Sequence, residues 1–156
     1  MRRIFPILIF TLLWSIPQSS ITQTADELSR EFELLIYTDP NSALEISKAQ
    51  LQKSIPNSID EVNALINNGQ ALYYMDSYDE ALGKLTKAAE IGDQIKHRLG
   101  VANAKYHTGE IAMLRGQHGR AIEQFIGSMD IFTELRDSVG IALCLNSIGS
   151  VYTSQG

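Results

Sequence analysis

Apolar residues recur at intervals of three and four along most of the chain. Leu28, Phe32 and Ile36 would share one face of a helix, and similar spacing continues through residues 43–51 and 62–75. These intervals match the 3.6-residue turn of an α-helix. No stretch alternates apolar and polar residues in the manner of a half-buried strand. The pattern therefore predicts an all-α protein built from successive short helices.

Several local signals mark where these helices begin and end. A serine or threonine followed three residues later by glutamate predicts a capping box, which satisfies free amide groups at a helix start. The predicted boxes are Thr24 with Glu27, Ser58 with Glu61, and Ser77 with Glu80. Asp39-Pro40 predicts a further start, because proline suits the first helical position. Gly100 and Gly140 are predicted to end helices in the left-handed conformation.

The helical pattern repeats itself with a fixed 40-residue period. Gly69 and Ala81 recur as Gly109 and Ala121, and Gly149 begins a third copy. A fixed period of roughly 20–50 residues indicates a solenoid rather than a single globular core. Such an architecture favours an extended binding surface over a catalytic pocket.

Two of the repeated glycines fall inside predicted helices. Each costs about 1 kcal/mol of helix stability relative to alanine. We expect close helix packing to offset that cost, because a neighbouring helix can approach Gly69 and Gly109 where no side chain intervenes. The large residues expected to fill the remaining space are Leu65, Leu72, Leu85 and Phe125.

The repeated unit carries a recognisable motif. It reads A-L-x-x-N-G-x-x-L over residues 64–72 and D-x-Y-x-x-A-x-x-x-L-x-x-A over residues 76–88. This motif resembles the tetratricopeptide repeat in a 40-residue version, and the resemblance covers about residues 26–156. The resemblance implies a right-handed superhelix of helix-turn-helix units. Glu31, Lys105 and His118 depart from the residues that such repeats usually carry at their positions.

The resemblance divides the chain into segments. Residues 26–57 form a degenerate first helical pair, 58–98 and 99–138 form two repeats, and 139–156 form the first helix of an incomplete repeat. About three repeats are thus followed by an incomplete one. Ile148, Val151 and Tyr152 would lack a partner helix there. We expect a continuation of the chain, or a partner protein, to cover them.

Residues 1–25 differ from the rest of the chain. Arg2 and Arg3 precede an apolar run over residues 4–14 and a small polar stretch over 15–20, which is typical of a secretory signal peptide. A run of this length falls short of the roughly 20 residues that span a bilayer. An uncleaved N-terminal anchor is the alternative. Both interpretations predict an exported protein, periplasmic or associated with a membrane.

Charge and cysteine content narrow the range of partners. The chain carries a net charge of −5, and without Arg2 and Arg3 the value is −7. An acidic protein repels phosphates, so nucleic acid is not an expected partner. Cys144 is the only cysteine, so no internal disulfide can form. It occupies the position of Ala64 and Ala104, which predicts a small buried residue rather than a reactive thiol.

In tetratricopeptide repeats the first helix of each pair lines a concave groove. By resemblance, the groove residues here are Asn63, Ile66, Gln70, Tyr73, Tyr74, Asn103, Tyr106, Glu110, Met113, Asn146 and Ser150, with Leu143 and Thr153 continuing the row. Aromatic and amide side chains suit a peptide ligand. Alternatively, Tyr73 or Tyr74 packs between helices. No cluster of lysine and arginine is present to bind a terminal carboxylate, so that ligand class is not expected.

No catalytic or cofactor-binding pattern emerges from the remaining residues. His97, His107 and His118 lack metal-ligand spacing, and we expect them to be solvated. His107 and Glu110 would share a helical face, but two ligands do not make a metal site. Residues 116–119 predict a turn between helices rather than a phosphate-binding loop, because no strand precedes them. We therefore expect no enzyme activity and no cofactor.

Two functions are compatible with these observations. The first is an exported module that binds a protein or peptide in the groove. The alternative is the periplasmic sensor portion of a membrane signalling protein, with a diguanylate cyclase or histidine kinase beyond residue 156. The combination of an export signal with 40-residue repeats resembles such receptors. Membrane attachment would then go through the N-terminus or through that C-terminal part.

Overall fold

A computed structural model describes residues 25–155 of the chain. This part folds into seven α-helices and contains no strand, which confirms the predicted all-α class. The helices are α1 (Ala25–Leu35), α2 (Pro40–Lys53), α3 (Ile59–Tyr74), α4 (Tyr78–Gln94), α5 (Arg98–Leu114), α6 (His118–Leu135) and α7 (Ser138–Thr153). None of these helices is both long and apolar enough to cross a membrane.

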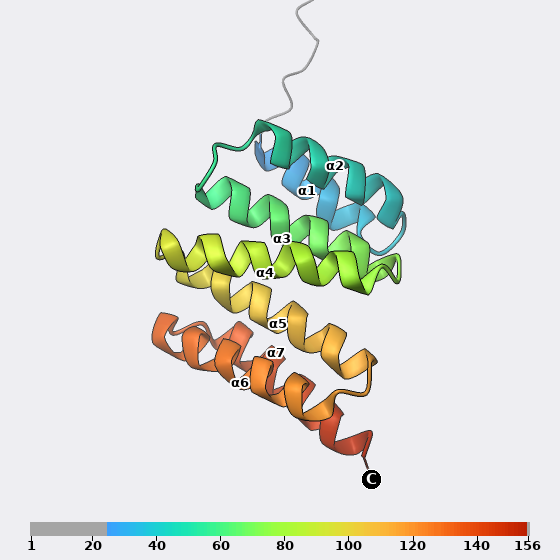
Figure 1. Ribbon diagram of the computed structural model, residues 1–156, viewed down its shortest axis with the longest axis vertical. Helices are drawn as coiled ribbons and strands as arrows, with labels where there is room; N and C mark the ends of the chain where they lie inside the picture. Colours follow the sequence, from blue (N-terminus) through green and yellow to red (C-terminus); the bar gives the residue numbers. More distant parts are fainter. Residues whose placement is uncertain (1–24, 156) are drawn as a thin grey trace, which may run out of the picture.

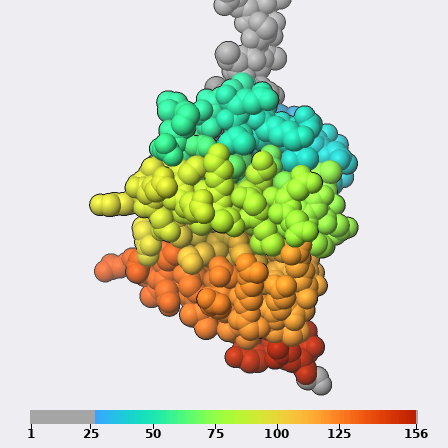
Figure 2. All heavy atoms as spheres, in the orientation of Figure 1, coloured from blue at the N-terminus to red at the C-terminus, as the bar shows by residue number. Residues whose placement is uncertain are grey.

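The helices stack in the order of the sequence. Each packs against the next, and α3 also contacts α5, as α5 contacts α7 (Figure 1). Figure 2 shows one face of the stack, on which α2, α4 and α6 follow one another as successive bands. The odd-numbered helices α3, α5 and α7 therefore form a second layer. This sequential packing is that of a helical-repeat solenoid.

The core is distributed along the stack rather than gathered at one centre. Two clusters of buried side chains lie among α1 to α5, and two more lie among α5, α6 and α7. The large residues predicted to fill the repeats are all buried, which confirms their assignment: Leu65, Leu72, Leu85 and Phe125. Cys144 is also fully buried, as expected from its repeat position.

Two repeated helical glycines, Gly69 and Gly109, lie at close contacts between paired helices. A Cβ atom on Gly69 would come within 2.8 Å of Leu85 Cγ, and one on Gly109 within 2.7 Å of Phe125 Cε1. Both distances are shorter than van der Waals contact. The expectation that these glycines admit a neighbouring helix is confirmed. Because Leu85 in α4 and Phe125 in α6 lie one repeat period apart, the contact itself repeats.

The last helix differs from α3 and α5 at the equivalent position. A Cβ atom on Gly149 would meet nothing within 4 Å. The prediction that Ile148, Val151 and Tyr152 form the uncovered face is wrong for Val151, which is fully buried, and for Ile148, which packs against the last core cluster. These two residues face α5 and α6. The exposed large apolar residues of α7 are Val139, Leu143, Leu145 and Tyr152, and the last two flank Gly149.

The prediction that Gly100 and Gly140 end helices is also wrong. Gly100 lies inside α5, where a Cβ atom would come within 2.6 Å of Val62 Cγ1, and Gly140 lies inside α7 against the Phe132 ring. Both glycines serve close packing. The residues in the left-handed conformation lie instead in the turns between consecutive helices from α2 to α7. They are Asn57, Asp76, Lys96, Gly116 and Arg136.

Two of the predicted helix starts, at Ser58 and Asp39, are capped as expected, and a third, at Ser77, is not. Ser58 caps α3 by accepting a hydrogen bond from the Glu61 amide at 3.2 Å, while the Glu61 carboxylate accepts from the Asn57 amide at 2.7 Å. Asp39 caps α2 ahead of Pro40, as expected. Ser77 makes no capping hydrogen bond, so the third box is not formed. Thr24 and the N-terminal segment over 1–24 lie outside the described residues.

Candidate functional site

A cavity of about 800 Å³ hollows the inner face of the stack. We call it the inner groove. Its wall is built mainly from α1, α3 and α5, with Phe132 of α6 and Leu143 of α7 at its far end. The first helices of successive pairs, α1, α3 and α5, have similar orientations in the stack. The same face of each therefore lines the cavity. The inner groove is therefore a product of the repeat.

Eight of the eleven predicted groove residues line this cavity together. They are Asn63, Ile66, Gln70, Tyr73, Tyr74, Asn103, Tyr106 and Glu110. Leu143 joins them from α7. Ile66 also belongs to the buried core, so it contributes an apolar base, whereas the other seven offer polar groups or rings.

The three remaining predicted residues lie elsewhere. Met113 packs against the core cluster around Phe125. Asn146 and Ser150 are exposed on α7, where the Ser150 hydroxyl donates to the Asn146 carbonyl at 2.9 Å. Thr153 likewise does not line the cavity. The cavity reaches α7 only at Leu143, so the row of groove positions does not continue down that helix.

Tyrosine rings form a connected row along one side of the inner groove. Tyr74 meets Tyr37 edge to face at 5.2 Å and Tyr73 at 5.0 Å between ring centroids. Tyr73 also packs against the core, so packing between helices describes part of its role. Tyr74 remains 42% exposed. Such edge-to-face pairs hold rings in fixed orientations, and Tyr74 therefore presents a positioned ring to the groove.

A hydrogen-bonded chain links α3 to α5 across the inner groove. The Gln70 side-chain amide lies 2.7 Å from His107 Nε2, and His107 Nδ1 lies 2.7 Å from Glu110 Oε2. If the Gln70 amide donates to Nε2, the neutral imidazole donates from Nδ1 to the carboxylate. The side chain of His107 is only 19% exposed, so the prediction of a solvated histidine is wrong here. These two hydrogen bonds hold the Glu110 carboxylate in one position.

The electrostatics of the inner groove favour neutral tyrosines beside a fixed carboxylate. Burial, followed by the charge of Glu110, raises the pKa of Tyr73 to about 12. Burial is also the main cause of the raised pKa values of Tyr74 and Tyr106, and Glu110 adds to both. At neutral pH these hydroxyls are therefore protonated and can donate hydrogen bonds. The lining residues include Glu33 and Glu110 but no lysine or arginine.

Several lining residues escaped the sequence analysis. Phe32, Glu33 and Tyr37 come from α1 or the turn after it, and Asn67 and His107 come from α3 and α5. A signal for Glu33 and Tyr37 was present. Glu33 precedes Gln70, and Tyr37 precedes Tyr74, by the same number of residues. This separation is slightly smaller than the 40-residue period of the later repeats. At the 40-residue period these pairs do not coincide, so the repeat alone does not indicate them.

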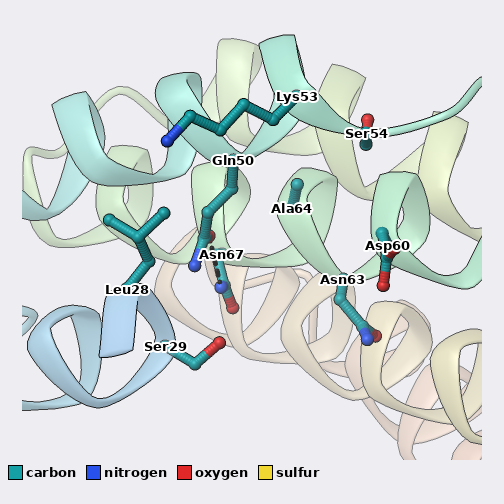
Figure 3. A pocket seen from close by; sticks show the side chains of 9 residues that line it. All are labelled: Leu28, Ser29, Gln50, Lys53, Ser54, Asp60, Asn63, Ala64 and Asn67. Carbon is teal, nitrogen blue, oxygen red and sulfur yellow. Dashed lines mark hydrogen bonds between the residues drawn. The ribbon is translucent and has the colours of Figure 1, made fainter. Parts of the chain in front are cut away.

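A second, smaller cavity of about 170 Å³ lies among α1, α2 and α3. Figure 3 shows its lining, with Gln50 and Asn67 pointing toward each other, and these two side chains form a 3.0 Å hydrogen bond. Ser29, Asn63 and Asn67 line both cavities. Small-molecule sites usually enclose roughly 300–1,000 Å³. The second cavity is therefore a side recess rather than a competing site.

The described part of the chain holds no group of three or more histidine, cysteine, aspartate or glutamate side chains that could bind a metal ion. No protein family model matches the chain, and no curated protein matches it either. Its function must therefore be inferred from the inner groove and the fold that forms it.

Proposed function

We propose that this protein is an interaction module that binds an extended peptide segment of another protein in the inner groove. The observation that carries the proposal is the composition of one continuous wall, which combines side-chain amides with aromatic rings. The amides are those of Asn63, Asn67, Gln70 and Asn103. Amide side chains can both donate to and accept from a peptide backbone, and tyrosine rings provide contact area at low entropic cost.

The length of the wall suits an extended segment. Packed helices lie about 8–10 Å apart, and the wall runs from α1 through α3 and α5 to the first turns of α7. An extended chain advances about 3.3 Å per residue, so several consecutive peptide residues fit along it. Helical-repeat solenoids generally use such concave surfaces for binding.

The proposal includes membership of the tetratricopeptide type and export from the cytoplasm. The 40-residue motif and the close contacts at Gly69 and Gly109 support the first. The segment from Arg2 to Trp14 supports the second. A fusion of residues 1–30 to a reporter that is active only outside the cytoplasm should be active. Changing Leu12 and Leu13 to Asp should abolish that activity, and an inactive native fusion would rule out export by this segment.

The groove is tested by comparing two exposed tyrosines. Peptides selected from a random 12-residue phage library on the full chain are synthesised with a fluorophore, and their affinities are measured by anisotropy. Tyr74→Ser should weaken binding by about 10-fold, because central aromatic residues contribute most to such interfaces. Tyr152→Ser provides the matched control, since Tyr152 is exposed on α7 and does not line the cavity. Equal effects of the two changes would rule out the inner groove as the binding site.

A further inference from the structure

We infer that the inner groove recognises a positively charged side chain, lysine or arginine, of the bound peptide, and that Glu110 and the tyrosines around it form the recognition site. This inference rests on the proposed function and adds the chemical class of the ligand. It starts from the charges of the lining residues. Glu33 and Glu110 are acidic, and the lining contains no lysine or arginine to neutralise them.

Glu110 is suited to hold a cation because its carboxylate is fixed and partly shielded from water. Its side chain is 25% exposed, and the one ion-pair partner that the structure shows for it is His107, a residue that is charged only when protonated. Attraction between opposite charges strengthens as the surroundings become less polar. A carboxylate at this position therefore binds an incoming ammonium or guanidinium group more strongly than a carboxylate on the outer surface.

Aromatic rings line the same cavity as this carboxylate. Tyr73, Tyr74 and Tyr106 line the same cavity as Glu110, and the Tyr106 ring lies 5.3 Å from the His107 ring that is hydrogen-bonded to Glu110. The charge of Glu110 also contributes to the raised pKa of all three hydroxyls. The faces of tyrosine rings attract cations, and arginine in particular stacks on them. A fixed carboxylate beside tyrosines offers a cationic side chain both charge attraction and ring stacking. Neither of these two interactions favours a neutral or an acidic ligand residue.

The protein itself already contains this kind of contact at the end of the tyrosine row. The guanidinium of Arg115 lies over the Tyr78 ring at 5.9 Å, and Tyr78 meets Tyr73 at 6.0 Å between centroids. Arg115 forms an ion pair with Asp79, at 2.7 Å, and does not line the inner groove. One end of the row is thus occupied by a cation from the chain, while Tyr74 remains open to the inner groove.

The test uses four fluorescent sets of nine-residue peptides with uncharged flanking residues and a central arginine, lysine, norleucine or glutamate. Affinities for the full chain are measured by anisotropy at constant ionic strength. The arginine and lysine sets should bind about 10-fold more tightly than the norleucine set. Glu110→Gln should reduce this preference to about 3-fold or less, while its amide oxygen can still accept the hydrogen bond from His107.

Glu123→Gln is the matched control, because it removes one negative charge from an exposed position on α6 that does not line the groove. It should leave the preference unchanged, which separates local recognition from attraction to an acidic protein. Thermal melts monitored by circular dichroism establish that both variants are folded.

The outcomes distinguish the inference from the function on which it rests. Binding of the arginine and norleucine sets with equal affinity, or a preference for glutamate, would overturn the inference and leave peptide binding intact. An unchanged preference in Glu110→Gln would also overturn it. If none of the four sets binds, both the inference and the proposed function fail.

Discussion

At the scale of single residues, the inner groove changes the ionisation of Tyr73. Its pKa rises from the ordinary value of 10.0 to about 12, first because the side chain is buried and second because Glu110 is negatively charged. The folded protein therefore retains the Tyr73 proton over a pH range in which the unfolded chain has released it. Stability and ionisation are linked in that range.

We predict that the free energy of unfolding falls as the pH rises from 10 toward 12, with part of the fall due to Tyr73. The raised pKa stabilises the folded state fully below pH 10, and this contribution is lost as the pH passes the folded-state value. Urea unfolding at a series of pH values should show a smaller fall for Tyr73→Phe than for the wild type. Identical pH profiles would contradict the assigned shift.

A second prediction at this scale compares one substitution at equivalent positions of two repeats. Gly109→Leu should lower the stability by about 1–3 kcal/mol or more, because the new side chain would overlap the Phe125 ring. Gly149→Leu should be neutral or stabilising, since that position is open and leucine favours a helix by up to about 1 kcal/mol over glycine. Thermal melts of both variants decide the matter. A neutral Gly109→Leu would mean that the repeat phase is wrong, and a loss for Gly149→Leu as large as that for Gly109→Leu would contradict the open space at Gly149.

At the scale of elements, the turns between helices combine the end of one helix with the start of the next. Asp76 is left-handed, its amide donates to the Tyr73 carbonyl, and the Ser77 amide donates to the Leu72 carbonyl at 2.9 Å. These two bonds define a Schellman end of α3. Ser77 consequently has φ −85° and ψ 57°, outside the extended region that a capping residue usually adopts. The turn geometry thus explains the missing cap.

We therefore predict different costs for two substitutions at helix starts. Asp137→Ala should destabilise the protein by about 1 kcal/mol, because its carboxylate accepts hydrogen bonds from the amides of Val139 and Gly140 at 3.0 and 3.1 Å. Ser77→Ala should cost much less, since its hydroxyl caps nothing. Urea unfolding measures both. A loss for Ser77→Ala as large as that for Asp137→Ala would contradict the described turn.

At the scale of the whole molecule, the stack exposes one face of its last helix. Leu145 and Tyr152 are 56% and 60% exposed. They occupy the positions of Leu65 and Leu72 of α3, two repeat periods earlier, and those residues are buried. Gly149 lies between them with free space above it. The face therefore has the composition of a helix-packing surface and lacks a helix on it.

We predict that a copy of residues 77–94 appended after Gly156 will cover this face. Gly156 follows Asp76 by two repeat periods, so the copy continues the chain in the phase of the repeat. The melting temperature should rise, because each Å² of apolar surface covered contributes about 25 cal/mol, and α7 should exchange its amide hydrogens more slowly.

The control for this extension carries Asp at the position copied from Leu85, which should abolish the gain. Leu85 is the residue that contacts Gly69 in the existing pair, and its copy would meet Gly149. If both extensions raise the melting temperature equally, the appended segment acts without docking on α7.

Local and periodic features could be predicted from the sequence alone. The helices follow from the spacing of apolar residues, and the close contacts at Gly69 and Gly109 follow from the 40-residue repeat. Eight of the predicted groove residues line one cavity for the same reason. In a solenoid each element contacts mainly its neighbours along the chain, so a repeated sequence implies a repeated contact.

Other features were decided only by the tertiary structure. The bond between Gln70 and His107, the contribution of α1 to the inner groove, and the packing of Gly100 and Gly140 all depend on how helices are placed against one another. A solenoid helix has one side toward its partner and another toward the adjacent repeat, and both are apolar. Periodicity therefore identifies the buried positions of α7, but only the arrangement of the neighbouring helices determines that Val151 is covered and Tyr152 is exposed.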